Sequence, residues 1–75
     1  MDAASRSLDV TVNGELRSVE PGSTVASLLD ELSQHPRTVV VEYNLDLIKR
    51  EAYATTLLRE GDRLEIVRFV QGGGV

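Results

Sequence analysis

The sequence predicts an α+β fold, in which a mixed sheet of four to five strands packs on one main helix. Three observations support this prediction. An alternating segment runs into an Asn-Gly pair, an apolar stripe with helical spacing follows, and β-branched and apolar runs fill the second half. Because the chain has 75 residues, we expect a single domain.

A β-hairpin is predicted at the start of the fold. Residues 8–12 alternate apolar and polar side chains, the period of a half-buried strand. The Asn-Gly pair at 13–14 predicts a type I′ turn, because that turn needs positive φ at both central positions. The return strand is expected over residues 15–19. Its apolar residues Leu16 and Val19 are out of phase, which indicates either a bulge or an edge position.

The main helix is expected after the Pro-Gly break at residues 21–22. Thr24, or alternatively Ser23, can cap its N-terminus through the side-chain hydroxyl. The apolar side chains then recur at i, i+3, i+4 and i+7, which makes one stripe to bury against the sheet. These side chains are Val25, Leu28, Leu29 and Leu32. His35-Pro36 is expected to end the helix.

The second half of the chain is predicted to complete the sheet. The expected elements are a strand over 38–43, a turn at 44–46, a short strand at 47–48, a helical or 3₁₀ turn within 49–58, and a last strand over 63–70. A turn at Gly61-Asp62 precedes the last strand. A hairpin, a right-handed crossover through a helix and further strands together predict the β-grasp, ubiquitin-like architecture.

Composition excludes several classes of function. The net charge of −4 argues against nucleic-acid binding and favours a partner with a basic surface. Without cysteine the chain has neither disulfides nor Cys-based metal sites. No apolar run is long enough to cross a membrane, and residues 1–7 lack a signal-peptide core, so we expect a cytoplasmic monomer. The expected organisation is a disordered lead-in at 1–7, a β-grasp domain at 8–70 and a flexible Gly-rich tail at 71–75.

Four segments carry a resemblance to a known family. They are Thr11–Glu15, Val39–Asn44, Lys49–Glu51 with Ala54–Thr56, and Gly61–Val67. In this order, and followed by Phe69-Val70 and a Gly-rich end, they resemble the ThiS family of sulfur carriers over about residues 8–74. Two departures stand out. The turn after Asn44 lacks the expected glycine, and Val75 follows the three glycines where family members end on Gly-Gly.

The resemblance implies a carrier rather than an enzyme. An E1-like adenylating enzyme, using ATP and Mg, would activate the terminal carboxylate at Gly73 or Gly74. A sulfur donor, such as a cysteine desulfurase, would then convert it to a thiocarboxylate that supplies thiazole synthase in thiamin biosynthesis. The chain itself would contribute no catalytic residue and bind no cofactor or metal. The sequence leaves open which glycine ends the mature chain and whether Val75 is removed.

An apolar docking patch is expected just before the tail. Val67, Phe69 and Val70 cannot all share one buried phase, because successive strand side chains point to opposite faces. Some of them are therefore expected at the surface, unless the segment near 57–58 covers them. The candidate partner-binding residues are Val67, Phe69, Val70, Gln71 and Gly72.

Other polar residues are interpreted as structural or solvated. His35 is expected to be a helix-end residue rather than a metal ligand, and Asp30-Glu31 a solvated helix face. Arg50 is interpreted as a surface charge, with contact to a partner carboxylate as the alternative.

Four alternative functions stay open. Two are carriers of the same fold: the small subunit of molybdopterin synthase, and a carrier for amino-acid biosynthesis whose tail a protease trims. The third is a ubiquitin-like modifier, and the fourth is a non-covalent β-grasp interaction module.

Overall fold

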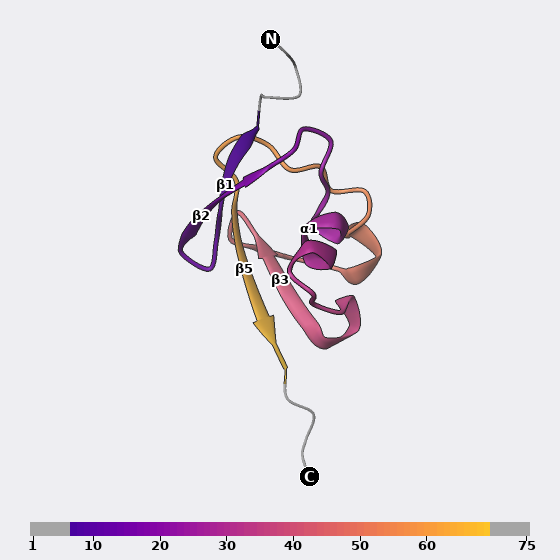
Figure 1. Cartoon of the computed structure of the whole chain (residues 1–75). Helices are drawn as coiled ribbons and strands as arrows, with labels where there is room; N and C mark the ends of the chain where they lie inside the picture. The colour runs from indigo at the N-terminus through magenta and orange to yellow at the C-terminus, as the bar shows by residue number, and fades with distance from the viewer. Residues whose placement is uncertain (1–6, 70–75) are drawn as a thin grey trace.

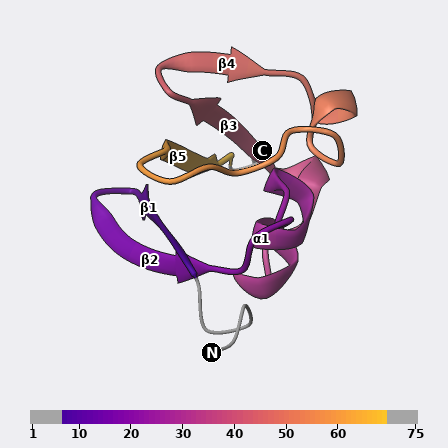
Figure 2. The same ribbon diagram turned by 90° about the horizontal axis from the view of Figure 1, so that it is seen from above.

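A five-stranded mixed sheet curves around α1 in the computed structural model, which describes residues 7–69 (Figures 1 and 2). The strand order is β2-β1-β5-β3-β4, with β1 and β5 parallel and the other neighbours antiparallel. The elements are β1 (Leu8–Val12), β2 (Glu15–Val19), α1 (Val25–Glu31), η2 (Pro36–Thr38), β3 (Val39–Tyr43), β4 (Asp46–Ile48), η3 (Arg50–Ala52) and β5 (Arg63–Arg68). The predicted β-grasp architecture is therefore confirmed.

The β1–β2 hairpin forms as its sequence predicts. Asn13 and Gly14 have φ values of 51° and 85°, the left-handed pair that a type I′ turn needs. Pairing runs without interruption from Leu8 with Val19 to Val12 with Glu15, so the paired residues contain no bulge. Instead, β2 lies at the edge of the sheet, which explains its mostly exposed side chains.

The α1 helix is capped and packed as predicted. The Ser27 amide donates to Thr24 Oγ1 (3.1 Å) and the Thr24 amide to Ser27 Oγ (2.9 Å), so two N-terminal donors are satisfied. In the apolar stripe, Val25, Leu28 and Leu29 are buried. Leu32, the C-cap residue, is partly buried against the core. The core comprises Val10, Val12, Val19, Val25, Leu28, Leu29, Val39, Val41, Tyr53, Leu58 and Leu64.

The end of α1 differs from the sequence prediction. The helix stops at Glu31, before the proline, because Ser33 adopts a left-handed φ of 59°. The Ser33 amide donates to the Asp30 carbonyl (3.1 Å) and the Gln34 amide to the Leu29 carbonyl (2.9 Å), which together form a Schellman motif. Such a motif usually employs glycine, so the sequence carried no clear signal for it.

His35 and Pro36 begin a 3₁₀ helix instead of ending α1. His35 Nδ1 accepts from the Arg37 amide at 3.1 Å and so caps η2. Thr38 belongs to η2, and β3 begins one residue later than predicted. A polar cap with proline at the first helical position is the usual start of such a helix.

The β3–β4 turn is tighter than predicted. It consists of Asn44 and Leu45 with φ values of 50° and 78°, while Asp46 pairs with Tyr43 within β4. Leucine rarely adopts positive φ because its Cβ crowds the backbone. The Leu45 side chain is nevertheless 78% exposed, so packing against the core does not offset this strain.

The last strand is shorter within the described residues than the predicted 63–70. β5 ends at Arg68, and the Phe69 amide donates to the Thr38 carbonyl at 3.0 Å. Val70 lies outside the described residues. The predicted 3₁₀ turn within 49–58 is η3.

We predict that Leu29→Ala lowers the free energy of unfolding by about 2–5 kcal/mol, because this fully buried side chain would leave a cavity. Urea unfolding measures the change. The matched control is Leu57→Ala, which truncates a leucine that is 53% exposed and should cost less than about 0.5 kcal/mol. Equal costs for the two variants would show that the helix stripe does not form the core.

Candidate functional site

The predicted site falls at the C-terminal end of β5, and the structure describes part of it. Val67 and Phe69 are described and exposed. The other candidate residues lie outside the described residues: Val70, Gln71, Gly72, Gly73 and Gly74. The fold therefore establishes the position of the chain up to Phe69, the residue just before the other candidates.

β5 is the central strand of the sheet, with β1 on one side and β3 on the other. It directs the chain to the end of the fold at the bottom of Figure 1. There the Phe69 amide is held by the Thr38 carbonyl. Only Val70 and Gln71 separate this anchored residue from the first of the three glycines. The glycine run thus follows the central strand of the sheet by three residues in sequence.

The two faces of β5 differ in what covers them. Leu64 is buried and Ile66 partly buried on the side of α1, while Val67 is 56% exposed on the opposite face. The segment at 57–58 does not cover Val67. Leu58 lies in the core, and Leu57 forms an isolated antiparallel β-bridge with Thr24, next to the helix.

An open-face groove of about 490 Å³ surrounds Val67. Val40 pairs directly with Val67, and Leu47 lies on the next strand. The residues lining the groove are Val40, Glu42, Leu45, Leu47, Arg63, Glu65 and Val67. Sequence reasoning found Val67 but missed the other apolar members. Glu42, two residues after Val40, was the available signal, because residues two apart in a strand share a face and a carboxylate favours the solvent side.

A buried carboxylate connects two of the segments that carried the resemblance. Asp62 is 7% exposed. Its Oδ2 accepts from the Tyr43 hydroxyl (2.6 Å) and the Arg59 amide (2.8 Å), and its Oδ1 from the Asn44 side-chain amide (3.1 Å). Asn44 Oδ1 in turn accepts from the Arg63 amide at 2.9 Å. Because every member has a partner, the Asp62 network fixes the entry into β5 structurally. Sequence reasoning did not identify it.

Burial raises the pKa of the Tyr43 phenol, and the hydrogen bond to Asp62 and the charge of that carboxylate raise it further, against an opposing effect of Arg59. Burial likewise raises the pKa of Tyr53, with Arg50 opposing it. Both phenols are therefore held in the neutral form, in which Tyr43 can donate to Asp62.

The remaining candidate residues lie on the surface. Arg50, Asp30 and Glu31 are exposed, and exposed His35 serves as the cap of η2. Within residues 7–69, no group of three His, Cys, Asp or Glu side chains is arranged to hold a metal ion. No helix in the same part of the chain is long and apolar enough to cross a membrane.

Comparison with known proteins identifies the family. The ThiS family model matches residues 10–73, most of the chain. The chain belongs to the ThiS family. Its fold is similar to that of the thiamine biosynthesis protein ThiS from Geobacter metallireducens, with a TM-score of 0.75, 33% identity and coverage of 88% of this chain and 100% of the other.

Curated relatives of this ThiS-family chain are of two sizes. Thiazole synthases of Paramagnetospirillum magneticum and Magnetococcus marinus are 41% and 36% identical over 66 residues, which cover 88% of this chain but 20% of each synthase. The sulfur carrier protein ThiS of Escherichia coli is 24% identical over 66 residues, which cover 88% of this chain and 100% of that protein. This chain thus spans one small part of the two synthases and the whole of the carrier.

We predict that Tyr43→Phe destabilises the fold near neutral pH by about 1.5–3 kcal/mol. The Asp62 carboxylate, a charged acceptor, loses the hydrogen bond that the Tyr43 hydroxyl donates. The raised pKa of Tyr43 means that its stabilising contribution is complete below its unfolded pKa of about 10. This contribution is lost as pH rises through the folded pKa.

The difference in unfolding free energy between wild type and Tyr43→Phe should therefore narrow above about pH 10. Urea unfolding across neutral and alkaline pH measures it. Tyr53→Phe is the control for the hydrogen bond at neutral pH, since Tyr53 is also a phenol with a raised pKa but, within residues 7–69, donates no hydrogen bond to Asp62. A difference for Tyr43→Phe that stays constant with pH would contradict the prediction.

Proposed function

We propose that this chain is a cytoplasmic sulfur carrier of thiamin biosynthesis, acting as a protein co-substrate rather than an enzyme. Its terminal glycine carboxylate is adenylated and then converted to a thiocarboxylate, which donates sulfur for thiazole formation. The observation that carries the proposal is the ThiS family match, which extends through Gly73. The Escherichia coli relative, named as a sulfur carrier, supports it.

The proposed chemistry needs only a carboxylate from this chain. A carboxylate oxygen attacks the α-phosphorus of ATP and pyrophosphate leaves, which forms an acyl adenylate. A sulfur nucleophile then attacks the acyl carbon and AMP leaves, so one difficult substitution becomes two easier ones. The chain has no cysteine, so sulfur is carried on the acyl carbon and not on a thiol. ATP and Mg belong to the E1-like adenylating partner, and the sulfur comes from a cysteine desulfurase or similar donor.

Glycine suits the reacting end of such a carrier for a steric reason. A residue without Cβ lets the backbone enter a narrow enzyme channel and adopt conformations that other residues avoid. Gly72, Gly73 and Gly74 supply three such residues in succession. The anchored Phe69 defines the point from which this segment extends.

The open-face groove is proposed as the docking surface for the adenylating enzyme. Val40, Leu45, Leu47 and Val67 expose apolar surface on one face of the sheet. Of these, Val67 and its partner Val40 lie near the C-terminal end of β5. Clustered exposed apolar side chains are typical of an interaction site. Glu42 and Glu65 outnumber Arg63 among the groove's charges, which favours a partner with a basic rim.

Thiazole synthase is the proposed sulfur acceptor. Two proteins with that name contain a segment 36–41% identical to this chain, which supports a direct working relationship between the two kinds of domain. This observation favours thiazole formation over the molybdopterin and amino-acid pathways.

We predict that forms of the chain ending at Gly73 or Gly74 gain about 16 Da when incubated with ATP, an E1-like enzyme and a sulfur source, as sulfur replaces one oxygen. The form ending at Val75 should convert poorly, because a β-branched residue crowds the carbonyl that sulfur attacks. Intact-protein mass spectrometry gives the result. A known carrier serves as the positive control.

If that control converts while all three forms stay unmodified, the carrier proposal fails. Adducts on lysine side chains, in place of the sulfur gain, would indicate a ubiquitin-like modifier instead. Equal conversion of all three forms would support the carrier and contradict the proposed effect of Val75.

For docking, we predict that Val67→Ser and Leu47→Ser each raise the KM of the adenylating enzyme for the carrier at least about tenfold, as expected for central apolar contacts. Exchange of labelled pyrophosphate into ATP measures the adenylation step. Leu57→Ser is the matched control, because Leu57 is 53% exposed but lies outside the groove. An effect of Leu57→Ser as large as that of Val67→Ser would refute docking through this face.

A further inference from the structure

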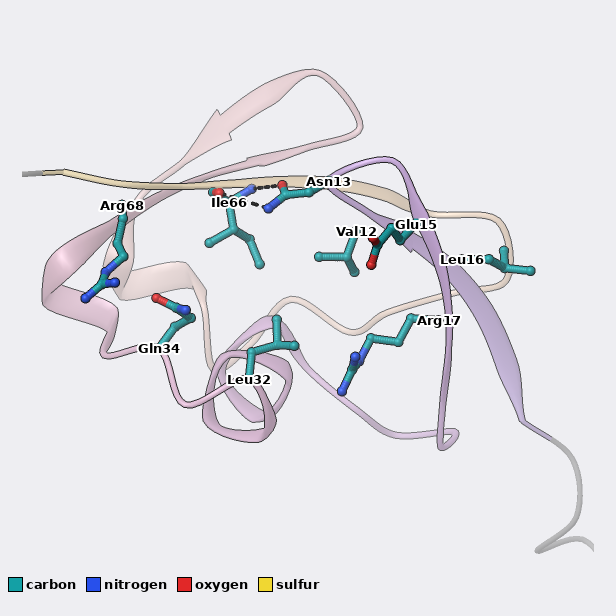
Figure 3. Close-up of a pocket in the computed structure, with 9 residues that line it drawn as sticks. All are labelled: Val12, Asn13, Glu15, Leu16, Arg17, Leu32, Gln34, Ile66 and Arg68. Atoms are coloured by element: carbon teal, nitrogen blue, oxygen red, sulfur yellow. Dashed lines mark hydrogen bonds between the residues drawn. The ribbon is translucent and has the colours of Figure 1, made fainter.

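A second cleft lies on the helix side of the sheet, between the β1–β2 hairpin, the C-terminal end of α1 and β5 (Figure 3). It holds about 480 Å³. Val12, Leu32 and Ile66 provide its apolar floor. Because Ile66 and Val67 are successive residues of β5, this cleft and the open-face groove lie on opposite faces of the sheet. We refer to it as the helix-side cleft.

Both walls of the helix-side cleft are held in place by hydrogen bonds. The side chain of Asn13 accepts from the Ile66 amide (2.7 Å) and donates to the Ile66 carbonyl (3.2 Å), which fixes the hairpin tip against β5 (Figure 3). Across the cleft, the Schellman motif holds Gln34 in place, because the Gln34 backbone amide donates a hydrogen bond to the Leu29 carbonyl. A site with fixed walls loses little conformational entropy when a ligand binds.

Two arginines flank the apolar floor. Arg17 pairs with buried Val10 across the hairpin, so its side chain projects to the helix side of β2. Arg68 approaches from β5, and Figure 3 shows the two guanidinium groups on opposite sides of Leu32. Glu15 is the acidic residue among those that line the cleft. The helix-side cleft is therefore locally basic on a chain whose net charge is −4.

We infer that the helix-side cleft binds an acidic segment of a partner protein, in which one aliphatic side chain sits between carboxylates. The aliphatic side chain would cover Leu32 and Ile66, and carboxylates would pair with Arg17 and Arg68, whose planar groups suit them. The described residues that line the cleft include no aromatic ring on which a nucleotide base could stack. This binding is additional to the proposed sulfur chemistry and independent of it.

The test uses the ¹⁵N-labelled full chain and the synthetic peptide acetyl-Glu-Glu-Leu-Glu-Glu-amide, followed by amide chemical shifts. We expect shifts centred on Arg17, Leu32, Gln34 and Arg68, with a Kd on the order of 1 mM. The double variant Arg17→Gln/Arg68→Gln should bind at least about tenfold more weakly, and Glu15→Gln should bind more tightly. Replacing the central leucine of the peptide by serine should also weaken binding.

The matched control is Arg50→Gln/Arg59→Gln, which removes the same charge from exposed arginines that line neither the helix-side cleft nor the open-face groove. It should keep at least about half of the wild-type affinity. Thermal unfolding checks that each variant is folded.

Several results would overturn the inference. The first is that wild type does not bind the peptide at a peptide concentration of about ten times the expected Kd. The second is that the two double variants lose equal affinity for the peptide. The third is that the amide chemical-shift changes centre on the open-face groove. Inorganic phosphate is titrated separately. If it displaces the peptide and the serine peptide binds as well as the leucine peptide, the cleft is a small-anion site and not a docking site for an acidic segment.

Discussion

The parallel pairing of β1 with β5 is the constraint on which the rest of the structure depends. It joins the first and last strands through the bonds from Thr11 amide to Asp62 carbonyl (2.8 Å), Asn13 amide to Leu64 carbonyl (2.9 Å) and Gly61 amide to Asp9 carbonyl (2.8 Å). Parallel neighbours need a crossover, and here α1 and the β3–β4 hairpin lie between them in sequence. The pairing makes β5 central, and so determines where the chain approaches its glycine run.

A central strand exposes two faces, and the protein uses them differently. Towards α1, Leu64 completes the core and Ile66 forms part of the floor of the helix-side cleft. Away from α1, Val67 joins Val40 in the open-face groove. The one α-helix in the described residues covers one face of the sheet, so the exposed apolar side chains on the other face are available to a partner.

Most elements were predictable because their signals are local. Asn13-Gly14 determines its own turn, and Thr24 caps the helix through residues three positions away. The predictions failed where the chain departs from the usual residue. Ser33 and Leu45 take left-handed conformations that normally indicate glycine, so the end of α1 and the exact β3–β4 turn were misplaced.

The sequence by itself determined the strand and helix pattern, the resemblance to the ThiS family and the glycine run, because each depends on neighbouring residues or on their order. Tertiary structure decided which residues distant in sequence come together. It brought the Asp62 carboxylate within hydrogen-bonding distance of the Tyr43 and Asn44 side chains, and it placed Arg17 across the helix-side cleft from Arg68. Such neighbours depend on strand order and register, which arise only when the whole sheet closes, and no local pattern encodes them.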